Sequence, residues 1–218
     1  MDALKAIRHR RTVRTYTDRP VLDEDLDRLL RLALLAPTGG MAQAWGLVVV
    51  RDPERRAKMA EIVMDGGAEY FRVARPPAEG TTPEEHAKWA RGYADTVLAS
   101  YPKVPVWIVG LLVPRHLYPE DWRSWERDAD LESLAFAMEN LFVAARAMEL
   151  GTAPTSFHMF AEAALRDMLE LPEGVEAPLV TPLGYPEEFP VGLPPAMAKR
   201  RRPWRTLVHN ERYGATRA

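Results

Sequence analysis

Hydrophobic residues recur along the chain at intervals that predict helices alternating with a few short strands. After Asp23, which can cap a helix, apolar residues follow at three- and four-residue intervals as far as Pro37. These positions are Leu26, Leu29, Leu30, Ala33 and Leu34. Residues 47–50 form an apolar, mostly β-branched run that predicts a buried strand, and residues 54–63 predict a helix after it.

The middle of the chain combines weak periodicity with one strongly apolar segment. Between residues 65 and 103 the apolar spacing weakens and glycine and proline accumulate, although residues 84–98 regain a helical pattern. We interpret residues 65–103 as a lid. Residues 104–113 are apolar and β-branched enough for a central strand, and the aromatic-rich residues 114–130 predict irregular structure.

The second half of the chain predicts the most buried helix. Residues 131–150 carry an apolar stripe, and Gly151 supplies the stop. The stripe consists of Leu134, Met138, Leu141, Phe142 and Ala145. A short segment at 152–157, a helix at 161–171 and a strand at 177–183 follow. Widely spaced strands, and a basic tail that has no strand, predict an α+β sheet flanked by helices rather than a Rossmann unit.

Composition narrows the class of protein. Apolar residues make up 47% of the chain and charged residues 28%, as in soluble globular proteins. The longest apolar run, residues 104–113, is shorter than the roughly 20 residues that a membrane-spanning helix needs. The first residues lack the apolar stretch of a secretory signal, so we expect a cytoplasmic protein with no membrane partner. The absence of cysteine excludes disulfides, thiolate nucleophiles and zinc-thiolate sites.

Common catalytic and nucleotide-binding motifs are missing. The chain has neither a GxGxxG dinucleotide motif nor a GxxxxGK[ST] phosphate loop. The five histidines lack metal-ligand spacing, which argues against a catalytic metal. No GxSxG motif surrounds a serine, and Ser156 lacks flanking glycines, so hydrolase chemistry is disfavoured. The pair Ser156 and His158 is more typical of a structural or pocket-lining role than of a catalytic one.

The first candidate binding segment is RRTVR. In an extended strand Arg10, Thr12 and Arg14 would project to one side. Arginine suits phosphate because its planar donors bind two oxygens at once. The alternative is a solvated basic segment with no ligand.

A second candidate is the loop APTGGMAQAW. Gly39 and Gly40 would let the backbone approach a planar ligand closely, and Gln43 offers both a donor and an acceptor to the edge of a heterocycle. The alternative is an ordinary helix-ending loop in which Trp45 belongs to the core.

A third candidate is the tail KRRRPWRTLVHNERYG. Its aromatic and aliphatic residues normally find something to bury against, so we expect an ordered tail whose cations bind an anion. A solvated charge run is the alternative. Because the net charge of the chain is −2, two short basic clusters fit a small anionic ligand better than nucleic acid.

Taken in order, five segments resemble the nitroreductase family from end to end. They are RRTVRTYTDRPV, APTGGMAQAWGLVVVRD, MENLFVAARAMELGT, LPEGVEAPLVTPLGYP and KRRRPWRTLVHNERYG. The resemblance implies a single domain over residues 1–218, with variable lids at about 65–103 and 114–130. It also implies an α+β sandwich with a mostly antiparallel sheet, in an intertwined homodimer whose C-terminal tails extend onto the partner.

The resemblance further implies two FMN molecules at the dimer interface. Arg10, Arg11 and Thr12 would lie near the FMN phosphate and ribityl chain, and Lys199 and Arg201 would clamp the phosphate.

Other matched residues would surround the flavin ring. Arg14 would lie near the pyrimidine edge, where a fixed cation stabilises the reduced flavin. Thr155 and Ser156 would lie against the N5 side. The loop lent by the partner would contribute Pro37, Thr38, Gly39, Gly40, Met41 and Gln43.

The implied activity is a ping-pong transfer of hydride from NADH or NADPH to FMN and then to a small electron-poor acceptor such as a nitroaromatic or quinone. No catalytic side chain is required. Met41 and Ala44 depart from the family pattern, in which Asn precedes Gln-Pro-Trp, so acceptor preference can differ. The alternatives are dehalogenase-like or flavin-cleaving chemistry on the same fold, and a non-catalytic flavin-binding protein.

Overall fold

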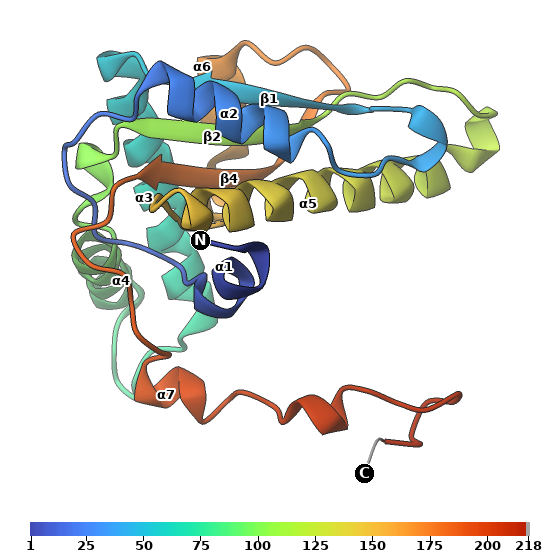
Figure 1. The fold of residues 1–218 in the computed structure, drawn as a ribbon. Coiled ribbons are helices and arrows are strands. Elements are labelled where there is room, and N and C mark those ends of the chain that lie inside the picture. Colours follow the sequence, from blue (N-terminus) through green and yellow to red (C-terminus); the bar gives the residue numbers. More distant parts are fainter. Residues whose placement is uncertain (217–218) are drawn as a thin grey trace.

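The computed structural model describes residues 1–216 and contains one sheet between two layers of helices (Figure 1). The strands stand in the order β1-β2-β4-β3. They are β1 (Trp45–Val50), β2 (Val106–Leu112), β3 (Gly151–Thr152) and β4 (Glu176–Gly184). All neighbouring strands pair antiparallel, and Thr12 adds an isolated parallel bridge to Thr152. This is the predicted α+β sandwich.

Helices cover both faces of the sheet. On one face lie α2 (Asp23–Ala33) and α5 (Arg123–Ala147), with α1 (Ala3–His9) packed against α5 (Figure 1). On the other face lie α3 (Pro53–Ala74) and α6 (Glu162–Leu169), with α4 (Pro83–Val97) packed against α3.

Strand β2 divides the core into two clusters because alternate side chains of a strand point to opposite faces. Trp107 and Val109 join the cluster beneath α3, which includes Met59. Ile108 joins the cluster beneath α2 and α5, which includes Leu134. Every residue of β2 is buried, which explains why its sequence is apolar rather than alternating.

Helix α3 is longer than its pattern predicts. It continues through Gly66 and Gly67 to Ala74 instead of ending at Val63, so the start of the predicted lid is helical. A Cβ atom on Gly66 would lie 1.9 Å from the carbonyl oxygen of Phe157. The glycines therefore leave room for a neighbouring segment to pack against α3. Because glycine stands where a helix would otherwise carry larger apolar side chains, the sequence lacks apolar periodicity there.

The predicted bounds of α2 are wrong at both ends. The N-cap position is Leu22, without a side-chain cap, and Asp23 pairs instead with the Arg51 guanidinium. The helix ends at Ala33, and a turn follows it before Pro37.

Two further helical regions differ from the sequence expectation. Helix α5 begins at Arg123, inside the segment expected to be irregular, where exposed tryptophans obscure the apolar stripe. Helix α1 was not predicted; Asp2 caps it by accepting a hydrogen bond from the Lys5 N–H at 2.9 Å.

The C-terminal tail leaves the body of the molecule after Phe189 (Figure 1). Residues 190–208 are exposed throughout and include the short α7 (Pro195–Ala198). Large apolar side chains stand exposed here, namely Val191, Leu193, Met197, Trp204, Leu207 and Val208. The tail adds no strand to the sheet among residues 1–216, as predicted. Among residues 1–216, every helix is too short or too polar to span a membrane.

Candidate functional site

The segment that contains Arg10–Arg14 runs along the edge of the sheet. Thr12 forms the parallel bridge to Thr152, and the Val13 N–H donates to the Thr152 carbonyl oxygen at 2.9 Å. Val13 is fully buried, whereas Arg14 is exposed. Within residues 1–216 the Arg14 guanidinium has neither an ion pair nor a hydrogen-bond partner, so its charge is available to a ligand.

The two preceding arginines already have partners. Arg10 Nε lies 3.3 Å from a Glu139 carboxylate oxygen. Arg11 Nη1 donates to the carbonyl oxygens of Arg8 at 2.9 Å and Arg10 at 2.7 Å, which caps the C-terminal end of α1. The buried Arg11 Nε has no partner among the described residues. Their proximity to a phosphate remains a prediction.

The glycine loop has an unusual backbone. Gly40, Met41 and Gln43 have φ angles of 54°, 55° and 47°, in the left-handed region that non-glycine residues rarely adopt. The Gln43 N–H donates to Thr38 Oγ1 at 3.0 Å, which closes the loop on itself. Met41 and Gln43 are exposed, and so are Pro37 and Gly39. The loop thus presents side chains outward from the body.

Within one chain, this loop and Arg10 contact different sides of α5. The Gly39 N–H donates to Ser133 Oγ of α5 at 3.4 Å, whereas Arg10 pairs with Glu139 of the same helix. Successive helix residues are rotated by about 100°, which puts Ser133 and Glu139 on different sides of α5. The predicted flavin residues therefore form separate groups within the chain.

The Thr12–Thr152 bridge places the segment of Arg14 beside the strand that leads to Ser156. Thr155 N–H donates to the Val180 carbonyl oxygen at 2.9 Å, and Phe157 N–H donates to Thr155 Oγ1 at 3.1 Å. Ser156 is exposed, and its N–H donates to no acceptor within the described residues. The β3–β4 edge of the sheet therefore offers an unpaired cation and an unpaired backbone donor.

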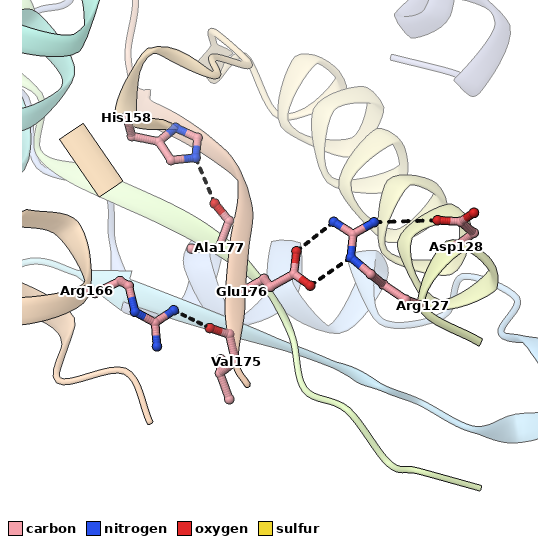
Figure 2. Close-up of polar contacts among 7 residues, drawn as sticks. All are labelled: Arg127, Asp128, His158, Arg166, Val175, Glu176 and Ala177. Atoms are coloured by element: carbon pink, nitrogen blue, oxygen red, sulfur yellow. Dashed lines mark hydrogen bonds and ion pairs between the residues drawn. The ribbon is translucent and has the colours of Figure 1, made fainter. Parts of the chain in front are cut away.

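The turn that carries Ser156 is anchored through His158 (Figure 2). His158 Nε2 lies 2.7 Å from the Ala177 carbonyl oxygen, and since a carbonyl only accepts, Nε2 carries the proton. Burial lowers the pKa of His158, which keeps the imidazole neutral. The structure thus supports the structural role over a catalytic one.

The same end of β4 has two more side-chain anchors (Figure 2). Arg166 of α6 donates to the Val175 carbonyl oxygen at 2.6 Å. Arg127 of α5 makes two bonds to the Glu176 carboxylate, at 2.8 and 2.7 Å. The start of β4 is fixed from both faces of the sheet.

The basic tail is not brought to the other cations. Lys199 and Arg201 are exposed and have no ion pair or side-chain hydrogen bond within residues 1–216. Their contact with a phosphate remains a prediction.

Sequence reasoning did not assign site roles to the aromatic residues beside the glycine loop. Tyr118 and Trp125 line a hollow of about 250 Å³ together with Gly39 and Gly40. The clustering of Tyr118, Trp122 and Trp125 in the sequence was the available signal.

Comparisons with known proteins agree with this fold. The model of the nitroreductase family matches residues 7–185. A protein of Archaeoglobus fulgidus named "Putative NADH dehydrogenase/NAD(P)H nitroreductase" is 32% identical over 189 residues, which are 86% of this chain and 87% of that protein. An iodotyrosine deiodinase of Nematostella vectensis is 26% identical over 84% of this chain and 66% of its own length.

A solved structure has the same fold. The NADPH:FMN oxidoreductase of Vibrio harveyi, complexed with NAD+, superposes with a TM-score of 0.72 at 19% identity, covering 97% of this chain and 77% of its own. The family match spans most of the sequence and the architecture agrees with it, so this chain belongs to the nitroreductase family.

Proposed function

We propose that this chain is an FMN-dependent oxidoreductase that takes hydride from NADH or NADPH and reduces a small electron-poor acceptor. Family membership and the names of its relatives support this activity. The observation that carries it is that the segments holding Arg14 and Ser156 both border the β3–β4 edge of the sheet, where the Arg14 guanidinium and the Ser156 N–H have no partner within residues 1–216. A cation near the pyrimidine edge would stabilise a reduced flavin, and a backbone donor could serve its N5 side.

We further propose that the site is completed by a second copy of the chain. The glycine loop lies on a different side of α5 from Arg10, so it is suited to serve the partner's flavin. The tail exposes apolar side chains that a partner surface would cover. An intertwined homodimer accounts for both features.

When bound, FMN would accept a hydride and pass electrons to the acceptor. The chain's own residues would bind and orient it. The Arg14 guanidinium would stabilise negative charge at the pyrimidine edge. Lys199 and Arg201 would neutralise the phosphate. Met41 would present an apolar, adaptable side chain to the acceptor. No side chain needs to act as a nucleophile.

Steady-state kinetics test the proposed cycle. Rates measured over a range of NADH concentrations, at several fixed concentrations of menadione, should give parallel lines in double-reciprocal plots. Intersecting lines would contradict a ping-pong cycle.

Reductive dehalogenation is a second candidate, favoured by the likeness to an iodotyrosine deiodinase. Iodide release from 3-iodotyrosine, measured with dithionite as reductant, would establish it. Release no faster than from free FMN would exclude it.

A further inference from the structure

His158 is a buried histidine with only one of its two ring nitrogens paired. The residue is 1% exposed, and its Nε2 atom lies 2.7 Å from the Ala177 carbonyl oxygen. The buried Nδ1 atom has no hydrogen-bond partner within residues 1–216. An apolar side chain of similar size would pack here without leaving a polar atom unsatisfied, so packing alone does not account for an imidazole. The bond from Nε2 to Ala177 is the feature that distinguishes this side chain.

That bond closes a short bridge across β4. The Thr155 N–H donates to the Val180 carbonyl oxygen at 2.9 Å, and His158 donates to Ala177 on the same strand. Ser156 lies between these two attachments, and its N–H has no acceptor within the described residues. The side-chain attachment is visible in Figure 2. The free N–H is therefore carried by a segment that is fixed to β4 on both sides.

Helix α3 packs closely against the same segment. A Cβ atom on Gly66 would lie 1.9 Å from the Phe157 carbonyl oxygen, and one on Gly67 would lie 3.2 Å from the Phe157 ring. The Phe157 ring also meets Tyr70 of α3, with ring centroids 5.1 Å apart. Because α3 leaves little free space beside Phe157, the place of Ser156 depends on its two attachments to β4.

We propose that His158 is a positioning residue for flavin reduction, whose bond to Ala177 holds the Ser156 N–H where it can donate to the flavin N5. The inference rests on the proposed function, in which this N–H serves the N5 side. A donor fixed at N5 favours hydride transfer to the ring, and a displacement of about 1 Å in a positioned group is enough to slow a reaction strongly. His158 itself neither touches the flavin nor transfers a proton.

The test compares three replacements of His158 in the FMN-loaded protein. His158→Leu fills the space but cannot donate to Ala177. His158→Gln places an amide N–H near the position of Nε2, whereas the shorter side chain of His158→Asn does not reach Ala177.

Arg166→Met is the matched control. Arg166 also anchors the start of β4, through the Val175 carbonyl oxygen at 2.6 Å (Figure 2). Its other hydrogen bonds go to the carbonyl oxygens of Leu171 and Pro172, away from the Ser156 segment. The control therefore removes an anchor of the same strand without cutting the bridge.

Two measurements separate positioning from stability. The nitrogen NMR shift of N5 in isotope-labelled oxidised FMN reports a hydrogen bond to that atom without any turnover. Stopped-flow absorbance gives the rate of flavin reduction at saturating NADH. Urea unfolding and the Kd of FMN are recorded for each variant as well.

His158→Leu and His158→Asn should move the N5 shift toward that of a flavin without a hydrogen bond at N5. They should also lower the rate of reduction by about fivefold to tenfold, the factor that one hydrogen bond contributes. His158→Gln should restore most of both quantities. Arg166→Met should lose stability in urea, but its N5 shift and its rate of reduction should stay close to those of wild type.

A His158→Leu protein that binds FMN and keeps the wild-type N5 shift and rate would overturn the positioning role alone. Equal changes in Arg166→Met would also overturn it, because the effect would then come from the strand as a whole. If His158→Leu does not fold, equal N5 shifts and rates in the Gln and Asn variants would overturn it in the same way. A wild-type protein that binds no FMN would overturn the proposed function and the role of His158 with it.

Discussion

Three arginines within five residues differ in what they can bind. Arg10 pairs with Glu139, and Arg11 caps the end of α1 through the carbonyl oxygens of Arg8 and Arg10. Arg14 has no such partner within residues 1–216 and stands exposed at the sheet edge. The three arginines therefore carry the same charge but differ in the partners they have in the fold. Arg14 is the residue we expect to act on the flavin ring.

Arg14→Ala should lower the rate of flavin reduction by NADH by about tenfold or more, because a fixed charge that stabilises the reduced ring is lost. Lys199→Ala should chiefly weaken FMN retention. Stopped-flow absorbance gives the first quantity, and the Kd of FMN after dialysis gives the second. Equal losses of both properties in both variants would contradict these roles.

His158 should make stability depend on pH. Burial lowers its pKa in the folded protein, so the unfolded chain binds the proton more readily. Stability is then complete above the unfolded pKa of about 6.5 and is lost as the pH falls through and below it, with a slope of at most about 1.4 kcal/mol per pH unit.

Urea unfolding between pH 5 and 8 measures this effect. His158→Gln should show a shallower pH dependence than wild type, although it is less stable at pH 8. His9→Gln is the control, because it makes the same replacement at an exposed histidine. An identical slope in the His158→Gln variant would refute the assignment.

The bounds of each helix and strand depend on the elements packed against it as well as on its own sequence. Strands β1, β2 and β4 are predicted by their apolar runs, although β1 is only partly buried apart from Val50, contrary to the expected buried strand. Helices α3 and α5 were predicted too short. In α3 the cause is Gly66, where only glycine leaves room for the backbone of Phe157, a residue remote in sequence. A contact between remote residues produces no periodic pattern of apolar positions.

Two glycine-to-alanine substitutions in neighbouring helices should have opposite effects. Gly66→Ala should destabilise the fold by about 3 kcal/mol or more, since its Cβ would meet a backbone carbonyl oxygen at 1.9 Å. Gly92→Ala in α4 has open space around it and should stabilise the protein by about 1 kcal/mol through helix propensity. Thermal or urea unfolding measures both. Similar effects in the two variants would contradict this packing of α3.

The candidate site likewise depends on how segments that are remote in sequence come together. The sequence places a basic segment, a glycine loop and a basic tail far apart, and within residues 1–216 the Thr12–Thr152 bridge places the Arg14 segment beside the strand that leads to Ser156. The remaining groups stay apart because the loop and the tail extend away from the β3–β4 edge. The homodimer is inferred from the family resemblance, because the hydrophobic periodicity of one chain gives no information about assembly between copies.

In the whole molecule, the exposed tail predicts that FMN retention depends on a partner subunit. A chain ending at Phe189 should keep its sheet and both core clusters, because residues 190–208 are exposed throughout. It should be monomeric by light scattering and retain little FMN, whereas the full chain should be a dimer. A truncated chain that remains a yellow dimer would contradict the tail exchange.

Anaerobic spectroscopy shows whether the chain is a flavin oxidoreductase. The purified protein, reconstituted with FMN if necessary, is titrated with NADH and then NADPH while its absorbance is recorded. We expect flavin absorption bands that bleach with at least one donor and return on addition of a quinone. A protein that binds no FMN, or whose bound flavin neither donor reduces, would contradict it.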